Sequence, residues 1–197
     1  PPACIRTLER CGIRFRGRTA QQSGLALATG GAEVRLLDLA NAYATLGRGG
    51  IYRDVTIFAD GPVHERRVLD ATVCRTISAI LSCRERTPRG QEHRDPRTLP
   101  WFCWKTGTSS SRRDAVAAGH NTRIAAAVWV GDFGGRGRVA YQGAQAAEPL
   151  LAEILTMPGL AAPADPPNPP PQTQNHPQHK KHKTTNHKTQ KTKTPPK

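Results

Sequence analysis

The sequence lacks any run of about 18 or more apolar residues, the length at which a stretch of chain is read as a membrane-spanning helix. It also begins with Pro1-Pro2 instead of an initiating methionine, and no basic and apolar leader typical of a signal peptide follows. The first absence excludes a transmembrane helix within this sequence. The second leads us to expect a fragment of a longer protein.

Residues that bind metals lack a ligand-like spacing as well. The five cysteines contain no C-x-x-C pair, the spacing typical of structural zinc sites and thioredoxin-like redox sites. His64, His93 and His120 are far apart in the sequence, and the other four histidines lie in a tract rich in Lys, Thr and Pro. We therefore expect isolated thiols, no metal site and no cofactor.

Lysine is almost missing from residues 1–162, which contain 21 arginines but only one lysine, Lys105. Arginine serves wherever a permanent positive charge is enough, because its guanidinium group stays protonated. An ammonium group is more compact, and its pKa can shift when it is buried. This lysine is therefore a candidate for chemistry that arginine cannot perform.

Apolar residues are missing from residues 163–197, with Ala164 as the exception. The segment holds nine of the 17 prolines, and seven lysines against one aspartate, in a chain of net charge +14. Too little apolar surface is available to offset the entropy lost on ordering, so we expect a disordered basic tail. Its cations are all lysine, whereas residues 1–162 use arginine, and this shift indicates a change of reading frame near Ala162.

Two helices are predicted before residue 84. The first covers residues 33–47, with Glu33 in its first turn, where a carboxylate interacts favourably with the helix dipole. The second covers residues 71–83 and is capped by Asp70. The apolar residues expected to face the core are Leu36, Leu39, Ala40, Tyr43 and Gly47 in the first helix, and Val73, Ile77, Ile80 and Leu81 in the second.

The sequence after residue 100 is typical of strands. Its apolar segments are short and separated by brief turns, which favours an antiparallel meander. A last helix is expected to start at Glu148-Pro149, where proline fits the first turn, and to cover the sheet. Helices followed by an antiparallel sheet and a covering helix give an α+β fold. The predicted strands are residues 51–58, 101–109, 114–119 and 124–130, and the last helix would bury Leu150, Leu151, Ile154 and Leu155.

The segment Lys105-Thr106-Gly107-Thr108-Ser109 is the candidate functional site. On a strand, the first, third and fifth of these residues point to one face, and Thr106 and Thr108 point to the other. Gly107 leaves room for a substrate to approach the backbone closely. The ammonium and hydroxyl groups suit a substrate carboxylate, and backbone N–H groups at a strand edge suit an oxyanion.

This segment resembles the K-T-G motif of penicillin-binding proteins and serine β-lactamases. Residues 30–50 are similar to the helix that precedes this strand in the bifunctional class A penicillin-binding proteins, and residues 113–131 are similar to the next two strands. Within that family the 1C branch matches best, over roughly residues 5–156. The resemblance implies a partial β-lactamase/transpeptidase-like α+β domain, with residues 1–162 as the C-terminal portion of a transpeptidase domain and residues 163–197 as its tail.

The resemblance implies peptidoglycan synthesis by acyl transfer. In the family, a serine in an S-x-x-K motif attacks a stem peptide that ends in D-Ala-D-Ala, and β-lactams mimic that substrate. Lys105 would be the catalytic residue that supports proton transfer. Thr106 and Thr108 would face the terminal carboxylate, and the N–H of Thr108 would form half of the oxyanion hole. Gly107 and Ser109 would belong to the same substrate-binding strand.

The resemblance also implies properties of the parent protein. It would carry a glycosyltransferase domain in addition to the transpeptidase. It would act at the periplasmic face of the bacterial inner membrane, held there by an N-terminal anchor that this sequence lacks. Its partners would be the peptidoglycan stem peptide and β-lactams, with no specific nucleic acid.

The sequence departs from the family because it lacks the nucleophile. None of its six serines has a lysine three residues later, and no S-x-N triplet occurs. In the family both motifs lie upstream of the helix that residues 30–50 resemble. This chain alone is therefore expected to be inactive, since it has the substrate-binding strand but not the serine that attacks.

A basic protein that binds polyanions or nucleic acids without catalysis is the alternative. The net charge of +14 and the lysine-rich tail favour it. Against it, the sequence has no helix-turn-helix pattern, no RNP-type aromatic pair and no basic stripe at helical spacing. Polyanion binding that falls steeply with salt and depends on the tail would distinguish this alternative.

Overall fold

The computed structural model describes residues 2–16, 22–58, 61–82, 87–95 and 98–163. The predicted disorder of the tail concerns residues 164–197, which lie outside this part of the chain. The predicted end of the second helix at Cys83 also lies outside it.

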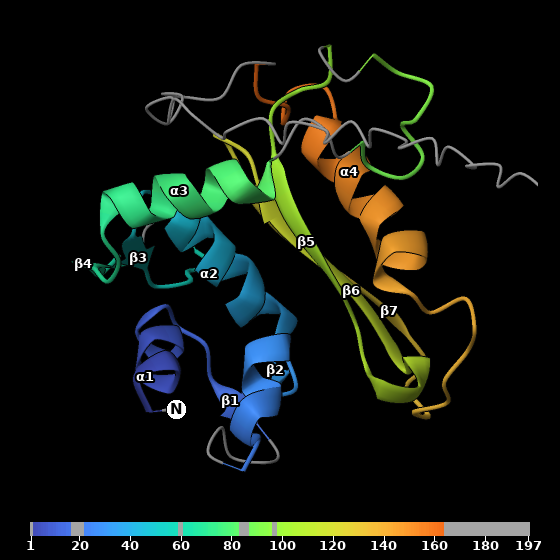
Figure 1. The fold of residues 1–197 in the computed structure, drawn as a ribbon. Coiled ribbons are helices and arrows are strands. Elements are labelled where there is room, and N and C mark those ends of the chain that lie inside the picture. Colours follow the sequence, from blue (N-terminus) through green and yellow to red (C-terminus); the bar gives the residue numbers. More distant parts are fainter. Residues whose placement is uncertain (1, 17–21, 59–60, 83–86, 96–97, 164–197) are drawn as a thin grey trace, which may run out of the picture.

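The described residues form an α+β fold around a three-stranded antiparallel sheet (Figure 1). Its strands lie side by side in the order β5 (Cys103–Thr108), β6 (Asp114–His120) and β7 (Ala125–Gly131). The predicted meander is therefore confirmed, and its strands end within two residues of the expected positions. Short turns join the three strands, so each pairs with its neighbour in sequence.

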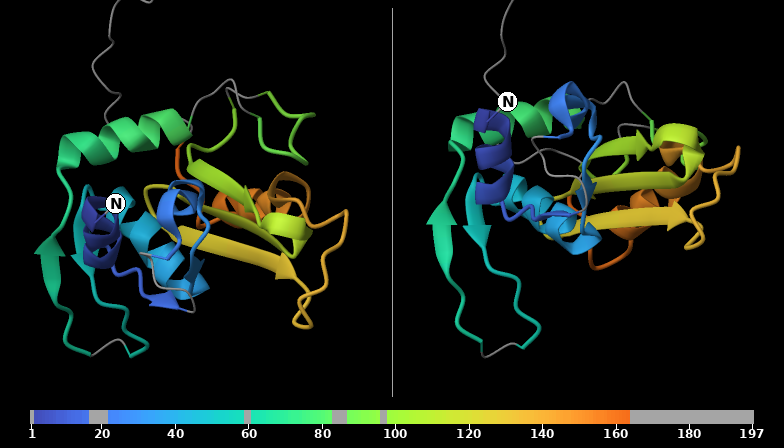
Figure 2. Two further views of the ribbon diagram at one scale, coloured as in Figure 1. Left: turned by 60° about the horizontal axis from the view of Figure 1, so that its bottom comes forward. Right: turned by 90° about the horizontal axis from the view of Figure 1, so that it is seen from below.

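Helices cover both faces of this sheet (Figure 2). On one face lies α4 (Glu148–Thr156), which begins where Pro149 predicts, after a single π-helical turn. Its residues Leu151 and Leu155 are fully buried. They form the main hydrophobic core together with Ala147 and the strand residues Phe102, Trp104, Ala115 and Ala117.

Helix α2 (Leu36–Gly47) lies on the other face and starts three residues later than predicted. Strand β2 (Glu33–Val34) occupies the predicted first turn and pairs with β1 (Phe15–Arg16). Because extended backbone cannot belong to a helical turn, the predicted role of Glu33 at the helix dipole is wrong. The carboxylate in the first turn of this helix is that of Asp38, which is buried.

Helix α3 (Ala71–Leu81) begins as predicted. The carboxylate of Asp70 accepts hydrogen bonds from the backbone N–H groups of Thr72 and Val73, at 2.7 and 3.2 Å. These groups have no partner inside the helix, so the side-chain cap stabilises the start of the helix.

The predicted buried face of α3 is wrong. Val73 and Ile80 are 49% and 67% exposed, whereas Cys74 and Ser78, which are four residues apart, are buried. In α2 the predicted stripe is also only partly covered, since Leu36 is 40% exposed. Apolar periodicity gives a helix but not its orientation, which contacts with the sheet decide.

The predicted strand at residues 51–58 is shorter in the structure. Strand β3 covers Ile51–Arg53 and pairs with β4 (Glu65–Arg67) in a two-stranded antiparallel ribbon. Ile57 and Phe58 lie beyond the paired residues and are exposed. The β-branched composition of this segment therefore reflects strand propensity without a partner to pair with.

An ion pair joins the N-terminal segment to α2. The side chain of Arg14 donates hydrogen bonds to both carboxylate oxygens of Asp38, at 3.1 and 2.9 Å, and its backbone N–H donates a third at 3.3 Å. Hydrogen bonds from the Arg14 side chain are the main reason that the pKa of Asp38 is lowered. A separate small apolar cluster surrounds Ile5. It is formed by α1 (Pro2–Arg10) and the short helix η1 (Gly24–Thr29), which both precede α2 in the sequence.

His120 connects the sheet to the helical layer of α2 and α3, and only 3% of it is exposed. Its Nε2 lies 3.2 Å from the Ser78 hydroxyl on α3, and its Nδ1 lies 3.1 Å from the carbonyl oxygen of Asn121. A neutral ring with its proton on Nδ1 satisfies both neighbours, because Nδ1–H donates to the carbonyl and Nε2 accepts from the hydroxyl. Burial lowers the pKa of His120, so the folded protein favours this neutral ring.

This arrangement predicts a pH dependence of stability. Because the pKa of His120 is lower in the folded state, the unfolded chain binds a proton first as the pH falls below about 6.5. The free energy of unfolding should therefore decrease as the pH falls below about 6.5, by at most about 1.4 kcal/mol per pH unit. Thermal unfolding followed by circular dichroism measures this slope. His120→Gln should remove it, whereas the same substitution at the exposed His93 should leave it unchanged.

Candidate functional site

Strand β5, at an edge of the sheet, has a buried half and an exposed half. Phe102 and Trp104 are buried in the main core, and Cys103 between them is fully buried against the opposite layer. From Lys105 onward the strand emerges, and Lys105, Gly107 and Thr108 are exposed, with Thr106 and Ser109 between exposed and buried. The first half anchors the strand, and the second half carries all five predicted site residues.

Side chains of the exposed half alternate between the two faces as predicted. Thr108 lies on the face of α4, because its hydroxyl oxygen accepts a hydrogen bond from the backbone N–H of Gly143 at 3.0 Å. Thr106 shares that face, since it lies two residues away on the same strand. Lys105 and Gly107 belong to the opposite face, on the side of α2 and α3.

The Lys105 side chain lies along the strand it belongs to. Its ammonium group donates a hydrogen bond to the carbonyl oxygen of Thr106 at 2.6 Å. Open space lies beside Gly107, where a Cβ atom would meet no other atom within 4 Å. A substrate could therefore lie directly against the backbone next to the positive charge of Lys105.

The outer edge of β5 carries backbone donors. The N–H of Ser109 donates across the ladder to the carbonyl oxygen of Asp114 at 2.9 Å. In an antiparallel pair this orientation alternates, so the N–H groups of Thr108 and Thr106 point away from β6. Among the described residues, no strand pairs with this outer edge. The N–H of Thr108 thus points toward the open edge of the sheet.

Ser109 has a structural role in the turn that follows. Its hydroxyl oxygen accepts a hydrogen bond from the backbone N–H of Asp114 at 2.8 Å. The Asp114 carboxylate accepts from the indole N–H of Trp129 at 2.8 Å. These bonds close the β5–β6 hairpin, and they leave the Ser109 hydroxyl with its own proton to donate.

Gly143 is a site residue that the sequence patterns do not indicate. A Cβ atom at this position would lie 2.4 Å from the carbonyl oxygen of Gly107 and 2.9 Å from its nitrogen. Only glycine fits so close to another backbone, so the turn before α4 packs directly on the K-T-G strand. The sequence signal is a single glycine before an alanine-rich segment, which is too common to be informative.

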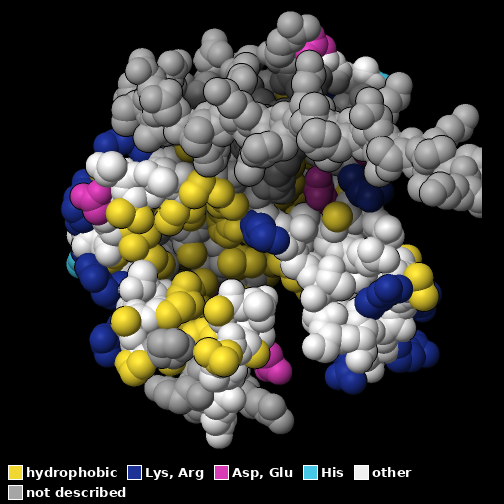
Figure 3. Space-filling model, viewed as in Figure 1, with side chains coloured by type: hydrophobic (Ala, Val, Ile, Leu, Met, Phe, Trp, Pro, Cys, Tyr) yellow, Lys and Arg dark blue, Asp and Glu magenta, His cyan; other side chains and the backbone are white. Residues whose placement is uncertain are grey.

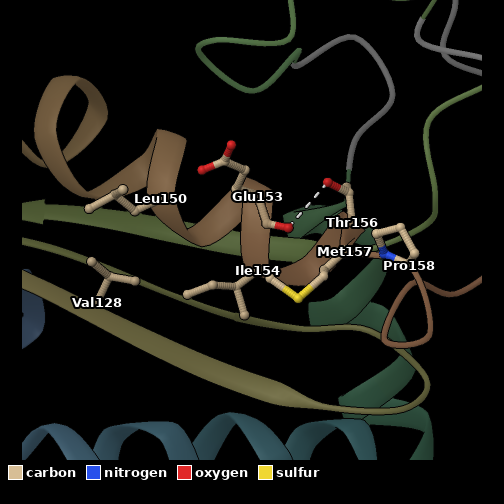
Figure 4. Close-up of a pocket in the computed structure, with 7 residues that line it drawn as sticks. All are labelled: Val128, Leu150, Glu153, Ile154, Thr156, Met157 and Pro158. Carbon is tan, nitrogen blue, oxygen red and sulfur yellow. Dashed lines mark hydrogen bonds between the residues drawn. The ribbon is translucent and has the colours of Figure 1, made fainter.

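A mostly apolar hollow lies away from this strand. It lies between α4 and β7 (Figure 4). Its volume is about 550 Å³. None of the five predicted site residues contributes to its lining, which is mostly apolar. The lining residues are Val128, Leu150, Glu153, Ile154, Thr156, Met157 and Pro158.

Two other kinds of functional feature are metal sites and membrane-spanning helices. Within the described residues, no three His, Cys, Asp or Glu side chains lie close enough together to hold a metal ion. In the same part of the chain, no helix has the length and apolar character needed to cross a membrane.

Comparisons with known proteins found similarity in sequence and in fold. No protein-family model matches the chain. Over 130 residues, 66% of its length, the chain is 35% identical to penicillin-binding protein 1C from Escherichia coli (strain K12), of which it spans only 16%. The crystal structure of a peptidoglycan glycosyltransferase from Burkholderia ambifaria superposes with a TM-score of 0.51 at 20% identity, covering 79% of this chain and 56% of that one. The second likeness shows a shared fold. The sequence match confirms that this chain resembles the penicillin-binding proteins, as its K-T-G strand and neighbouring segments predict.

Proposed function

We propose that residues 1–162 are the C-terminal portion of a penicillin-binding transpeptidase domain that acts in peptidoglycan synthesis. The observation that carries this proposal is the exposed K-T-G segment on the free edge of β5, with open space beside Gly107. The 35% identity to penicillin-binding protein 1C supports it, although the chain spans a small part of that relative.

In this proposal the substrate is a stem peptide that ends in D-Ala-D-Ala, and β-lactams occupy the same place. Its terminal carboxylate is bound by the Lys105 ammonium group and the threonine hydroxyls of β5 through charge-assisted hydrogen bonds. The Thr108 hydroxyl already accepts from the N–H of Gly143, so its own proton is available to donate to the carboxylate.

The acyl transfer itself needs a serine that this chain does not provide. In the proposed domain, a serine of an upstream S-x-x-K motif attacks the carbonyl carbon of the penultimate D-Ala, and D-Ala leaves. The developing oxyanion is stabilised by the outward N–H of Thr108 together with the backbone N–H of the serine. Lys105 supports proton transfer through its positive charge.

Exposed apolar side chains support the idea that further parts of the domain pack on this chain. Figure 3 shows a broad yellow area at the left of the molecule. On α2 and η1, Leu36, Leu37 and Leu25 are exposed, the last to 85%. Such contiguous apolar surface is unusual on an isolated domain. We propose that the segment with the nucleophile covers it, and that the parent protein also has a glycosyltransferase domain and acts at the periplasmic face of the inner membrane.

The first prediction is that this chain alone forms no covalent adduct with penicillin. No serine here has a lysine three residues later to activate it, and the oxyanion hole lacks its second donor. The measurement is incubation with a fluorescent penicillin followed by denaturing electrophoresis. A protein in which the upstream S-x-x-K segment is restored should give a labelled band. A stable band from the 197-residue chain would show that the nucleophile is misassigned.

The second prediction concerns Lys105 in such a restored protein. Lys105→Ala should slow acylation by penicillin at least ~30-fold, because losing the charge-assisted contact to the penicillin carboxylate in the closed site of the restored protein costs about 2 kcal/mol or more. Lys105→Arg should also be impaired, since the planar guanidinium is larger and has a different shape. The rate of labelling under single-turnover conditions measures both. Arg123→Ala, an exposed cation in the β6–β7 turn, is the control and should label normally. A normal rate for Lys105→Ala would refute the assigned role.

A further inference from the structure

Four exposed arginines gather at the end of the β5–β6 hairpin and on the loop after β7. Figure 3 shows dark-blue side chains on this lobe, at the lower right of the molecule. Asp132 forms ion pairs with two of them, with Arg136 at 3.3 Å and with Arg138 at 3.9 Å. Among the described residues, no carboxylate pairs with the other two. The paired residues are Arg136 and Arg138, and the unpaired ones are Arg112 and Arg113.

The backbone that carries the unpaired arginines is fixed in an uncommon conformation. Ser111 and Arg112 have φ angles of 60° and 53°, in the left-handed region that residues other than glycine seldom adopt. Two hydrogen bonds hold this turn: the N–H of Arg112 donates to Ser109 at 3.0 Å, and the N–H of Arg138 donates to Arg112 at 3.1 Å. Such a strained conformation persists where the surrounding structure enforces it.

The geometry of β5 sets the direction in which a bound peptide continues. A peptide whose terminal carboxylate lies at Thr106 and Thr108 has two directions in which to continue along the outer edge of β5. Toward Phe102 the strand is buried in the core, so a peptide cannot follow it. Toward the hairpin end the strand is exposed, and Arg112 and Arg113 follow Thr108 by four and five residues. Three residues of extended peptide span about 10 Å in this direction.

We infer that Arg112 and Arg113 bind a second carboxylate of the stem peptide, located upstream of the terminal D-Ala-D-Ala. This inference rests on the proposed function, because it places the terminal carboxylate at the K-T-G segment. The two guanidinium groups present planar donors that match a carboxylate, and they have no carboxylate partner of their own in the described chain. The substrate class is therefore an acidic stem peptide, in preference to its amidated form.

The test compares two fluorescently labelled pentapeptides that end in D-Ala-D-Ala. One has glutamate at its second position, and the other has glutamine there. Fluorescence anisotropy measures the affinity of each for the 197-residue chain at low salt. The acidic peptide should bind about two- to fivefold more tightly, as is typical of a partly exposed charge pair. This preference should shrink between 50 and 500 mM salt, because salt screens such pairs.

The double substitution R112Q/R113Q should abolish the preference while leaving the affinity for the glutamine peptide unchanged. Arg123→Gln, at the opposite end of the sheet, is the matched control and should keep it. The inference is overturned if the wild-type chain shows no preference or no measurable binding. It is also overturned if R112Q/R113Q keeps the preference, or if both peptides weaken equally, as for a non-specific polyanion surface.

Failure of this inference can be separated from failure of the proposed function. Benzylpenicillin carries one carboxylate and no upstream peptide, so its acylation of the restored protein depends on the serine and Lys105. In that protein R112Q/R113Q should label at the normal rate. Slow labelling of the double variant would place the two arginines at the terminal carboxylate and would overturn the assignment made here.

Discussion

The pairing of β5 with β6 determines what the candidate site presents. Lys105 lies opposite Ala118, and the N–H of Ser109 bonds to Asp114 across the ladder. In this register the N–H of Thr108 faces the open edge. A shift of one residue would turn that N–H toward β6 and exchange the two faces of the strand. The hydroxyl of Ser109, which accepts from the backbone of Asp114, holds the hairpin at the end where the shift would begin.

Close backbone packing transmits this register to the rest of the domain. The turn before α4 touches β5 at Gly143, whose N–H bonds to the Thr108 hydroxyl and whose missing Cβ lets it lie against Gly107. The leucines of α4 then bury the other end of the strand in the core. One strand is thus anchored by apolar contacts at its start and exposes polar groups at its end, which is how a rigid element can carry a substrate site. The hairpin end, with its unpaired Arg112 and Arg113, continues the same exposed edge.

Local signals in the sequence determined several features without the structure. The cap at Asp70 and the proline at the start of α4 were predicted because both act within one helical turn. The meander was predicted because short turns leave antiparallel pairing as the simplest arrangement of three consecutive strands. Lys105 stood out by composition, since it is the only lysine among 162 residues, and the motif around it indicated the family.

Contacts between distant residues decided what the sequence could not. The buried face of α3 is set by Ser78, which meets His120 across 42 residues, so the apolar residues that suggested another face are exposed. The residues predicted to form the first turn of α2 form a strand instead, in which Glu33 pairs with Arg16 of β1. Gly143 contacts the K-T-G strand although it lies 35 residues away from Thr108 in the sequence, and no local pattern predicts a contact over that distance. Propensity and periodicity therefore determined which elements form. Their orientation, and the neighbours of Lys105, required the free energy of tertiary packing, which depends on partners far away in the chain.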